Sequence, residues 1–173
     1  MNKVDIGKGT YVHGSATIVG EVRIGKNCSI WPNVVIRGDE NHMEIGDCTN
    51  IQDNSVLHTS YEGPLRIGKR VTIGHSCIIH ACTIGDDVLI GMGSIILDHS
   101  VIGEWSLVGA GSLVTEGKEI PPNSFVLGRP AKVVGDSSRY REIIANAHQE
   151  YEKLREEYLK IEESRSLQGS SKK

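Results

Sequence analysis

The stretch TIGDDVLIGMGSIILDHSVIGEWSLVGAGSLVTEGKEI, residues 83–120, carries the strongest pattern in this chain of 173 residues. Aliphatic residues return at every sixth position through it and just beyond it: Ile84, Ile90, Ile96, Ile102, Val108, Val114, Ile120 and Val126. A period of six fits neither the helical turn of about 3.6 residues nor the alternation of an ordinary strand. It is typical of hexapeptide repeats, in which a short strand and a corner make one side of a parallel β-helix.

The residues around each aliphatic position support a tightly coiled chain. Glycine follows many of them, as after Ile84 and Ile102, and a small residue often stands two positions before, as Ser94 does before Ile96. Each coil covers its apolar face only by stacking on its neighbours. We therefore predict an all-β domain over residues 1–135, and chance Ile-Gly pairs in a β-sandwich are the weaker interpretation. The same period is seen earlier, at Ile18, Ile24, Ile30, Ile36, Ile45, Ile51, Ile67 and Ile73.

Three interruptions of the period predict loops on a functional face, because insertions into repeats commonly gather there. One covers residues 37–44, RGDENHME, and another covers residues 58–66, HTSYEGPLR. The third is a single missing residue between Ile73 and Ile78. After the repeats, apolar residues at helical spacing predict a helix over residues 136–163, packed on the coil and capped by Ser137 or Ser138. Residues 164–173 are predicted to form a disordered tail.

Composition and charge exclude several classes of function. The formal net charge is -3, the pI is about 6.2, and the first 120 residues hold no basic patch, so we expect no nucleic-acid partner. The opening residues, MNKVDIGKGT, contain no apolar run that would form an export signal or a membrane span. The 4 cysteines form no CxxC pair, which favours reduced thiols and a cytoplasmic protein.

Three histidines stand in matching positions, each two residues after an aliphatic residue: His58, His75 and His80. His75 and His80 lie on consecutive sides of one coil and should diverge. His58 and His80 are 22 residues apart, about one coil plus the inserted loop, and should stack on one side. A lone histidine in a repeat is more often a surface residue. Three coils around a threefold axis could, however, add His75 of a neighbour to this pair, and three imidazoles with an open position form a catalytic zinc site.

Polar residues interrupt the apolar pattern just before His58: Arg37, Asp39, Glu40, Asn50, Gln52 and Asp53. Arg37 could pair with a carboxylate within a chain or across an interface. Gln52 could orient a metal-bound water or hydroxide, and Glu40 could accept or deliver a proton. The simpler interpretation of these residues is a solvated loop with local ion pairs.

The segments WPNVVIRGDE, TNIQDNSVLH, IGHSCIIHACTIGDDVLIGMGS and LGRPAKVV together resemble the gamma-class carbonic anhydrases. The resemblance covers nearly the whole chain. It implies a left-handed parallel β-helix of hexapeptide repeats with a C-terminal α-helix, assembled as a homotrimer. It also implies reversible hydration of CO2 to bicarbonate by a metal-bound hydroxide at the subunit interface.

Each motif residue inherits a role from this resemblance. His58, His75 and His80 match zinc ligands, with His75 supplied by the adjacent chain. The other matches are Gln52 and Asn50 beside the metal water, Glu40 as a carboxylate near the active site, Arg37, Asp39 and Asp53 as ion-paired interface residues, and Tyr151 as a pocket residue. The best-studied members carry a long acidic loop with a proton-shuttling glutamate, whereas this chain has the short segment TSYEGPLR with Glu62 as its only acid.

Two other functions remain open at this point. One is a hexapeptide-repeat acyltransferase, which typically uses one histidine base and a CoA thioester, so that a set of three histidines argues against it. The other is a non-catalytic trimer stabilised by its metal, to which the short loop points. Three imidazoles also suit Fe(II) or Co(II).

Overall fold

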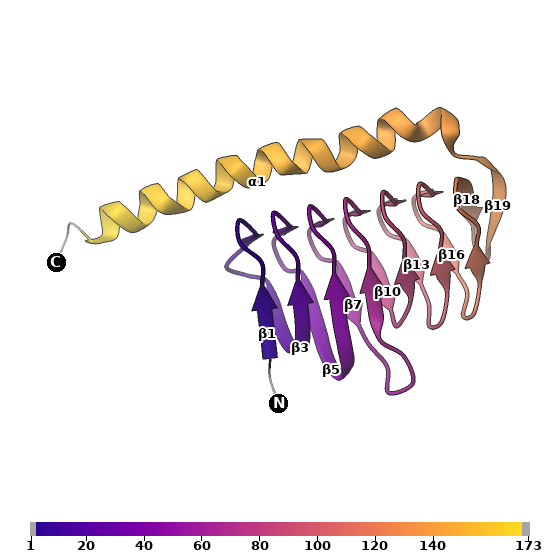
Figure 1. Cartoon of the computed structure of the whole chain (residues 1–173), viewed down its shortest axis with the longest axis horizontal. Coiled ribbons are helices and arrows are strands. Elements are labelled where there is room, and N and C mark those ends of the chain that lie inside the picture. Colours follow the sequence, from indigo (N-terminus) through magenta and orange to yellow (C-terminus); the bar gives the residue numbers. More distant parts are fainter. Residues whose placement is uncertain (1–2, 171–173) are drawn as a thin grey trace.

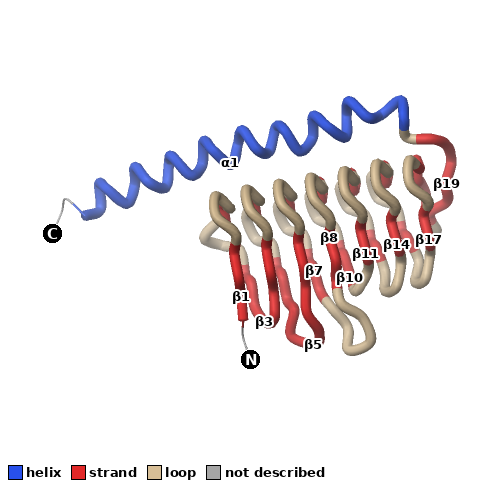
Figure 2. The backbone as a smooth tube through the Cα atoms, viewed as in Figure 1, coloured by secondary structure: helices blue, strands red, loops and turns tan. Residues whose placement is uncertain are grey.

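The computed structural model describes residues 3–170 and, of residues 166–170, the backbone alone. The repeats form a parallel β-helix in which short strands stack along one axis (Figure 1). Strands one coil apart pair in parallel, as Ile78 of one coil does with Val56 of the preceding coil and Ile95 of the next. The predicted all-β hexapeptide fold with a C-terminal helix is confirmed (Figure 2).

Each coil passes through three flat faces, which we name by what lies on their outer side. The aliphatic face contains the first halves of β3 (Thr17–Ile24) and β5 (Val35–Ile45), with β7 (Val56–His58), β10 (Ile78–His80), β13 (Ile95–Ile96) and β16 (Leu113–Val114). The charged face contains β1 (Lys3–Ile6), the second halves of β3 and β5, β8 (Leu65–Ile67), β11 (Thr83–Ile84), β14 (Val101–Ile102) and β17 (Glu119–Ile120). The helix-covered face contains β2 (Tyr11–Val12), β4 (Ser29–Ile30), β6 (Asn50–Ile51), β9 (Thr72–Ile73), β12 (Leu89–Ile90), β15 (Leu107–Val108), β18 (Ser124–Gly128) and β19 (Ala131–Asp136).

The interior is built from the periodic aliphatic residues, which are almost completely buried. The small residues beside them complete the hydrogen bonds of neighbouring coils. Thr49 Oγ1 donates to the carbonyl of Gly68 at 2.9 Å, and the thiol of Cys77 takes the equivalent place against Gly91 at 3.3 Å. Burial raises the pKa of Cys77 to about 11, so this thiol stays protonated and inert.

The prediction of a loop over residues 37–44 is wrong. β5 runs through this segment and turns the corner from the aliphatic face to the charged face, but its pairing with β3 shifts in register there. Gly38 pairs with Gly20 and Met43 with Val22, so residues 39–42 bulge out of the ladder. Two glycines allow the bend: Gly20 has φ +93°, and a Cβ on it would lie 2.1 Å from the carbonyl oxygen of Gly38. The insertion after His58 does form a loop, closed by a bridge between Ser60 and Gly63, and it projects from the solenoid in Figure 2.

The C-terminal helix begins later and ends later than predicted. A 3-10 turn, η1 (Ser138–Tyr140), leads into α1 (Arg141–Ser170), while Asp136 still belongs to β19. Asp136 Oδ1 accepts the backbone N–H of Ser138 at 2.7 Å, whereas the hydroxyl of Ser137 donates to the carbonyl of Trp105. The tail expected over residues 164–173 is helical as far as Ser170, and the last three residues lie outside the described part.

α1 lies along the helix-covered face and extends beyond the N-terminal end of the solenoid (Figure 1). Aromatic contacts anchor it, because the rings of Tyr151 and Tyr158 lie 5.4 and 5.1 Å from that of Trp31. Arg155 Nη1 donates to the carbonyl of Gly9 at 2.6 Å. Within residues 3–170, no helix combines the length and the apolar character needed to cross a bilayer.

Candidate active site

His58 and His80 lie side by side at the edge where the aliphatic face meets the charged face, which we call the pair edge. They end β7 and β10 and are direct partners in the strand register. The 22-residue spacing therefore spans one coil, as the sequence predicted. His58 Nδ1 lies 3.0 Å from His80 Nε2. Two imidazoles from adjacent coils thus turn one nitrogen each toward a common point.

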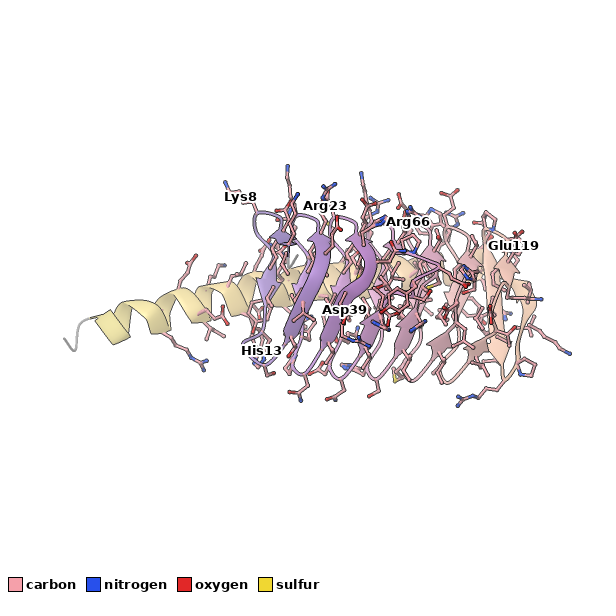
Figure 3. The ribbon with its side chains drawn as sticks, turned by 90° about the horizontal axis from the view of Figure 1, so that it is seen from below. Lys8, His13, Arg23, Asp39, Arg66 and Glu119 are labelled. Carbon is pink, nitrogen blue, oxygen red and sulfur yellow. The ribbon has the colours of Figure 1, made fainter. Side chains whose placement is uncertain are left out.

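Each of these rings has a carboxylate at its other nitrogen. His58 Nε2 lies 3.2 Å from Asp39 Oδ1, and His80 Nδ1 lies 2.5 Å from Asp98 Oδ1. Asp39 stands on β5, where Figure 3 labels it. Arg37 Nη1 donates to both of its oxygens, at 2.8 and 3.1 Å. The expected Arg37 ion pair therefore forms within one chain.

Both carboxylates remain ionised at neutral pH. The hydrogen bonds from Arg37, more than that from His58, hold the pKa of Asp39 below its usual value against partial desolvation. Burial is the largest single influence on Asp98 and opposes its ionisation, but the hydrogen bonds from His80 and Ser60 and the charge of His80 together lower the pKa of this carboxyl too. The sequence analysis missed Asp98. The spacing could have indicated it, because Asp98 follows His80 by 18 residues, or three hexapeptides, which places the two residues on adjacent coils.

His75 lies at the opposite edge of the aliphatic face, where it meets the helix-covered face, and we call this the His75 edge. It follows β9, and its Nδ1 lies 3.0 Å from Asp53 Oδ2 on the neighbouring coil. Beside it, Gln52 Nε2 donates to Asn50 Oδ1 at 3.2 Å, and Asn50 Nδ2 donates to Thr72 Oγ1 at 2.8 Å. These side chains are buried beneath α1, so the amide groups have a fixed orientation.

A hollow of about 230 Å³ lies between α1 and the helix-covered face, and Gln52, Gly74, Met92 and Tyr151 are among the residues that line it. Tyr151 therefore reaches the His75 edge from the helix. Burial, aided by the carboxylates of Asp53 and Glu150, raises the pKa of Tyr151. Its hydroxyl is a hydrogen-bond donor at neutral pH and not a base.

The structure thus divides the predicted site residues between two edges of one face. Arg37, Asp39, His58 and His80 gather at the pair edge, and the partly buried Glu40 is next to Asp39 on β5. Asn50, Gln52, Asp53, His75 and Tyr151 gather at the His75 edge. Among the described residues of a single chain, no group of three His, Cys, Asp or Glu side chains is placed to hold a metal ion. Tyr61, on the short loop after His58, is 81% exposed.

The parallel β-helix places this chain first in the class of hexapeptide-repeat proteins. The profile of the bacterial transferase hexapeptide family (six repeats) matches residues 3–38 and 81–116. The chain is 49% identical over 154 residues to a carbonic anhydrase of Geobacillus kaustophilus, covering 89% of this chain and 81% of the relative. It is 44% identical over 133 residues to the mitochondrial gamma carbonic anhydrase 2 of Arabidopsis thaliana, covering 73% of this chain and 48% of that protein.

Within the hexapeptide-repeat proteins, this chain belongs to the gamma-class carbonic anhydrase family. A solved structure from Bacillus cereus, of a protein with a provisional acetyltransferase designation, is also similar. It shares 43% identity and a TM-score of 0.90, covering 92% of this chain and 94% of that chain. Proteins similar to this chain therefore include some named carbonic anhydrase and one designated an acetyltransferase.

Proposed function

We propose that this protein is a metal-dependent carbonic anhydrase that hydrates CO2 reversibly to bicarbonate at sites shared between the subunits of a homotrimer. The observation that carries this proposal is the placement of two incomplete half-sites on opposite edges of the same face. Neither half is a metal site alone, but each supplies what the other lacks.

The aliphatic face has the character of a buried contact surface. Its outward side chains form one continuous apolar row in direct strand register: Val35, Val56, Ile78, Ile95 and Leu113. In the single chain, Ile78 is 43% exposed and Val56 is 39% exposed. Contiguous exposed apolar surface of this kind marks an interaction site. The row runs between the pair edge and the His75 edge.

Closing three chains around a threefold axis joins the two half-sites. When each aliphatic face turns toward the axis, the pair edge of one subunit meets the His75 edge of the next. A head-to-tail interface of this kind closes into a ring. His58 and His80 of one chain would then converge with His75 of its neighbour, and Gln52 and Tyr151 would arrive with that His75.

The donor set suits a divalent cation. If His58 and His80 each give their one ring proton to their carboxylate, the nitrogens that face each other at 3.0 Å both present lone pairs. His58 and His80 would hold such a cation, which would remove this repulsion, and the carboxylates would orient the rings as outer partners of metal-bound histidines do. Zinc is the first choice, with Fe(II) or Co(II) as alternatives. The bound cation supplies a Lewis acid that lowers the pKa of a water molecule to about 7.

The remaining residues bind, orient and move protons. Hydration joins a water oxygen to the carbon of CO2 and releases one proton for each bicarbonate. Because Asn50 holds the amide of Gln52, the Oε1 of Gln52 is free to accept a hydrogen bond from the attacking water and orient it. Tyr151 donates a hydrogen bond to an oxygen of CO2 or bicarbonate. Glu40, a partly buried carboxylate on β5, takes the released proton toward solvent.

Subunit mixing tests the shared site directly. His75→Ala and His80→Ala are each expected to abolish metal binding and CO2 hydration in stopped-flow assays. Co-refolding the two variants in equal amounts should restore about a quarter of the sites, because each mixed trimer regains one intact interface. Recovery of no metal and no activity from the mixture, with trimers present, would contradict the shared site.

The similarity to the Bacillus cereus structure makes acyl transfer the alternative activity, to be tested together with CO2 hydration. Acetyl-CoA turnover that survives His58→Ala, with CO2 hydration at background in the wild-type protein, would replace the proposed function with that one. Metal that raises the melting temperature without either activity would identify a non-catalytic trimer.

A further inference from the structure

We propose that Asp98 is a positioning residue for His80. Its carboxylate holds the ring proton of His80 on Nδ1, which leaves Nε2 free to bind a cation. This inference rests on the proposed function for the identity of the bound group, and its main readout is taken on the metal-free protein. Neither the sequence motifs nor the expected site included Asp98.

Asp98 ends a chain of four side chains stacked along the pair edge. Along it, Asp39 contacts His58 at 3.2 Å, His58 contacts His80 at 3.0 Å, and His80 contacts Asp98 at 2.5 Å. The contact between His80 and Asp98 is the shortest of the three. Asp98 is also the less exposed of the two carboxylates, with 26% of its side chain exposed against 44% for Asp39.

The two carboxylates are not equivalent partners. Asp39 has both oxygens engaged by Arg37, so its charge is shared between a guanidinium and His58. For Asp98, His80 supplies the only histidine, lysine or arginine nitrogen within 4.0 Å among the described residues, and the hydroxyl of Ser60 is a further side-chain partner. An imidazole that donates Nδ1–H to an ionised carboxylate keeps its lone pair on Nε2. In His80 that nitrogen is the one that faces His58.

The turn that carries Asp98 is held in place by the backbone. The N–H of His99 donates to the carbonyl of Ala81 at 2.9 Å, which ties the turn to the coil of His80. Ser100 Oγ donates to the carbonyl of Leu97 at 2.6 Å and closes the turn on its other side. The carboxylate therefore reaches His80 from a rigid support, and little conformational freedom is lost when the ring is oriented.

The first measurement is the tautomer of His80 in the metal-free trimer near pH 8, read from long-range proton–nitrogen NMR correlations of labelled histidines. The wild-type protein should show the Nδ1–H form. Asp98→Ala should shift His80 toward the Nε2–H form that dominates in free imidazole side chains, and Asp98→Asn, whose Oδ1 can still accept Nδ1–H, should largely restore the wild-type signal. An Nε2–H form in the wild-type protein would overturn the inference.

The second measurement is zinc affinity, by competition with a chelating dye. Loss of an outer carboxylate partner weakens metal binding by about 10- to 100-fold, and we expect Asp98→Ala to fall in this range. Asp86→Ala is the matched control, because Asp86 also accepts a bond at 2.8 Å on the solenoid but its donor is the backbone N–H of Lys69. An Asp98→Ala affinity within about twofold of this control, with an unchanged tautomer, would refute the positioning role.

These outcomes separate the inference from the proposed function. If the wild-type protein binds zinc but does not hydrate CO2, the tautomer and affinity results still decide the role of Asp98. If it binds none of zinc, Fe(II) and Co(II), the proposed function fails, and the tautomer measurement alone decides whether Asp98 sets the state of His80.

Discussion

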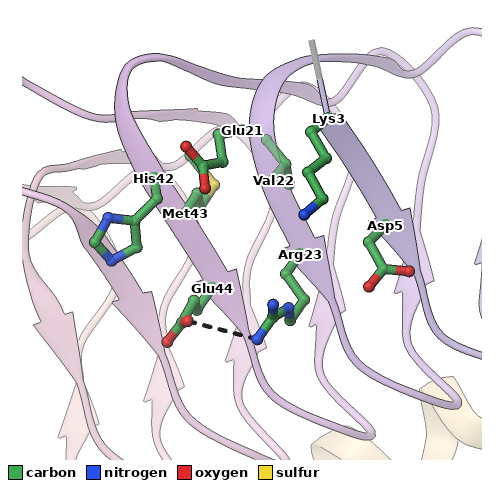
Figure 4. A pocket seen from close by; sticks show the side chains of 8 residues that line it. All are labelled: Lys3, Asp5, Glu21, Val22, Arg23, His42, Met43 and Glu44. Carbon is green, nitrogen blue, oxygen red and sulfur yellow. Dashed lines mark ion pairs between the residues drawn. The ribbon is translucent and has the colours of Figure 1, made fainter. Parts of the chain in front are cut away.

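The aliphatic face and the charged face are built from the same inward residues but carry opposite outward rows. Inward, both present a continuous line of buried aliphatic side chains, such as Ile79 on one and Ile84 on the other. Outward, the aliphatic face presents its apolar row, whereas the charged face presents Asp5, Arg23, Glu44 and Arg66 in direct register. Figure 4 shows several of these charged side chains around a shallow hollow between β1, β3 and β5.

The difference teaches which positions specify the fold and which specify assembly. Burial of the inward residues drives coiling, and this contribution does not depend on which side chains point outward. Alternating charges along neighbouring strands keep a sheet face hydrated and discourage association with other chains. An unbroken aliphatic row at the same positions favours association. We therefore propose that the charged face is the solvent side of the solenoid and the aliphatic face its contact side.

The largest expected effect comes from placing one charge on each face. Ile78 and Val101 are nearly equally exposed in the single chain, at 43% and 40%. Ile78→Lys buries an unpaired ammonium group at the proposed threefold axis, which costs about 3 kcal/mol or more and weakens trimer association by roughly 100-fold. Analytical ultracentrifugation should detect smaller species, and bound metal should fall with the trimer content.

Val101→Lys is the matched control on the charged face. It adds the same group beside Thr83 and Glu119, where water can solvate it. We expect an unchanged trimer and a free energy of unfolding within about 0.5 kcal/mol of wild type. If the Lys at position 101 dissociated the trimer and the Lys at position 78 did not, the assignment of the two faces would be reversed.

A smaller effect is expected within the charged row itself. Arg23 Nη1 and Glu44 Oε1 are 4.0 Å apart, and both side chains are largely exposed. A double-mutant cycle of Arg23→Ala and Glu44→Ala, followed by urea unfolding, should give a coupling of about 0.2–1 kcal/mol that disappears at high salt. A coupling well above this range, or a change in oligomeric state, would mean that the row is not simply a hydrated surface.

The smallest effect is expected at the start of α1, away from both faces. Hydrogen bonds from the side chain and backbone of Ser138 hold the pKa of Asp136 below its usual value. A carboxyl with a lowered folded-state pKa stabilises the protein above its unfolded pKa of about 3.9 and loses that contribution as the pH falls through the folded value. Asp136→Asn should therefore slightly narrow the difference in melting temperature between pH 6 and pH 3, as scanning calorimetry can measure. An equal or larger difference would contradict this role.

Much of the fold follows from spacing alone, because a parallel coil converts sequence distance into spatial position. The 22 residues between His58 and His80 correctly predicted adjacent coils, and the same arithmetic would have found Asp98 at 18 residues. Spacing alone gave the wrong prediction for the segment Arg37 to Glu44. The lost period there predicts a loop, but β5 accommodates the extra residues as a shift in its register against β3, where Gly20 and Gly38 let both strands turn the corner. Local spacing cannot report a bend that depends on the neighbouring coil.

The helix shows the same limit. Its apolar spacing predicted that it exists and which side packs, but its ends depend on contacts with distant residues. The hydroxyl of Ser137 donates to the carbonyl of Trp105 and does not cap the helix. The helix therefore starts after the capping site that the sequence favoured. Arg155 and Tyr158 hold the far half of α1 against the first coils, and the helix continues to Ser170.

The sequence by itself determined the coiled fold and the pairing of His58 with His80, because a six-residue period leaves one way to bury the aliphatic residues and stack the coils. Only the tertiary structure decided that His75 lies at the far edge of the same face, that Arg37 pairs with Asp39 inside the chain, and that Asp98 supports His80. These depend on how the coil divides into faces and where its corners turn. Corner positions are set by hydrogen bonds between coils, which no single repeat contains.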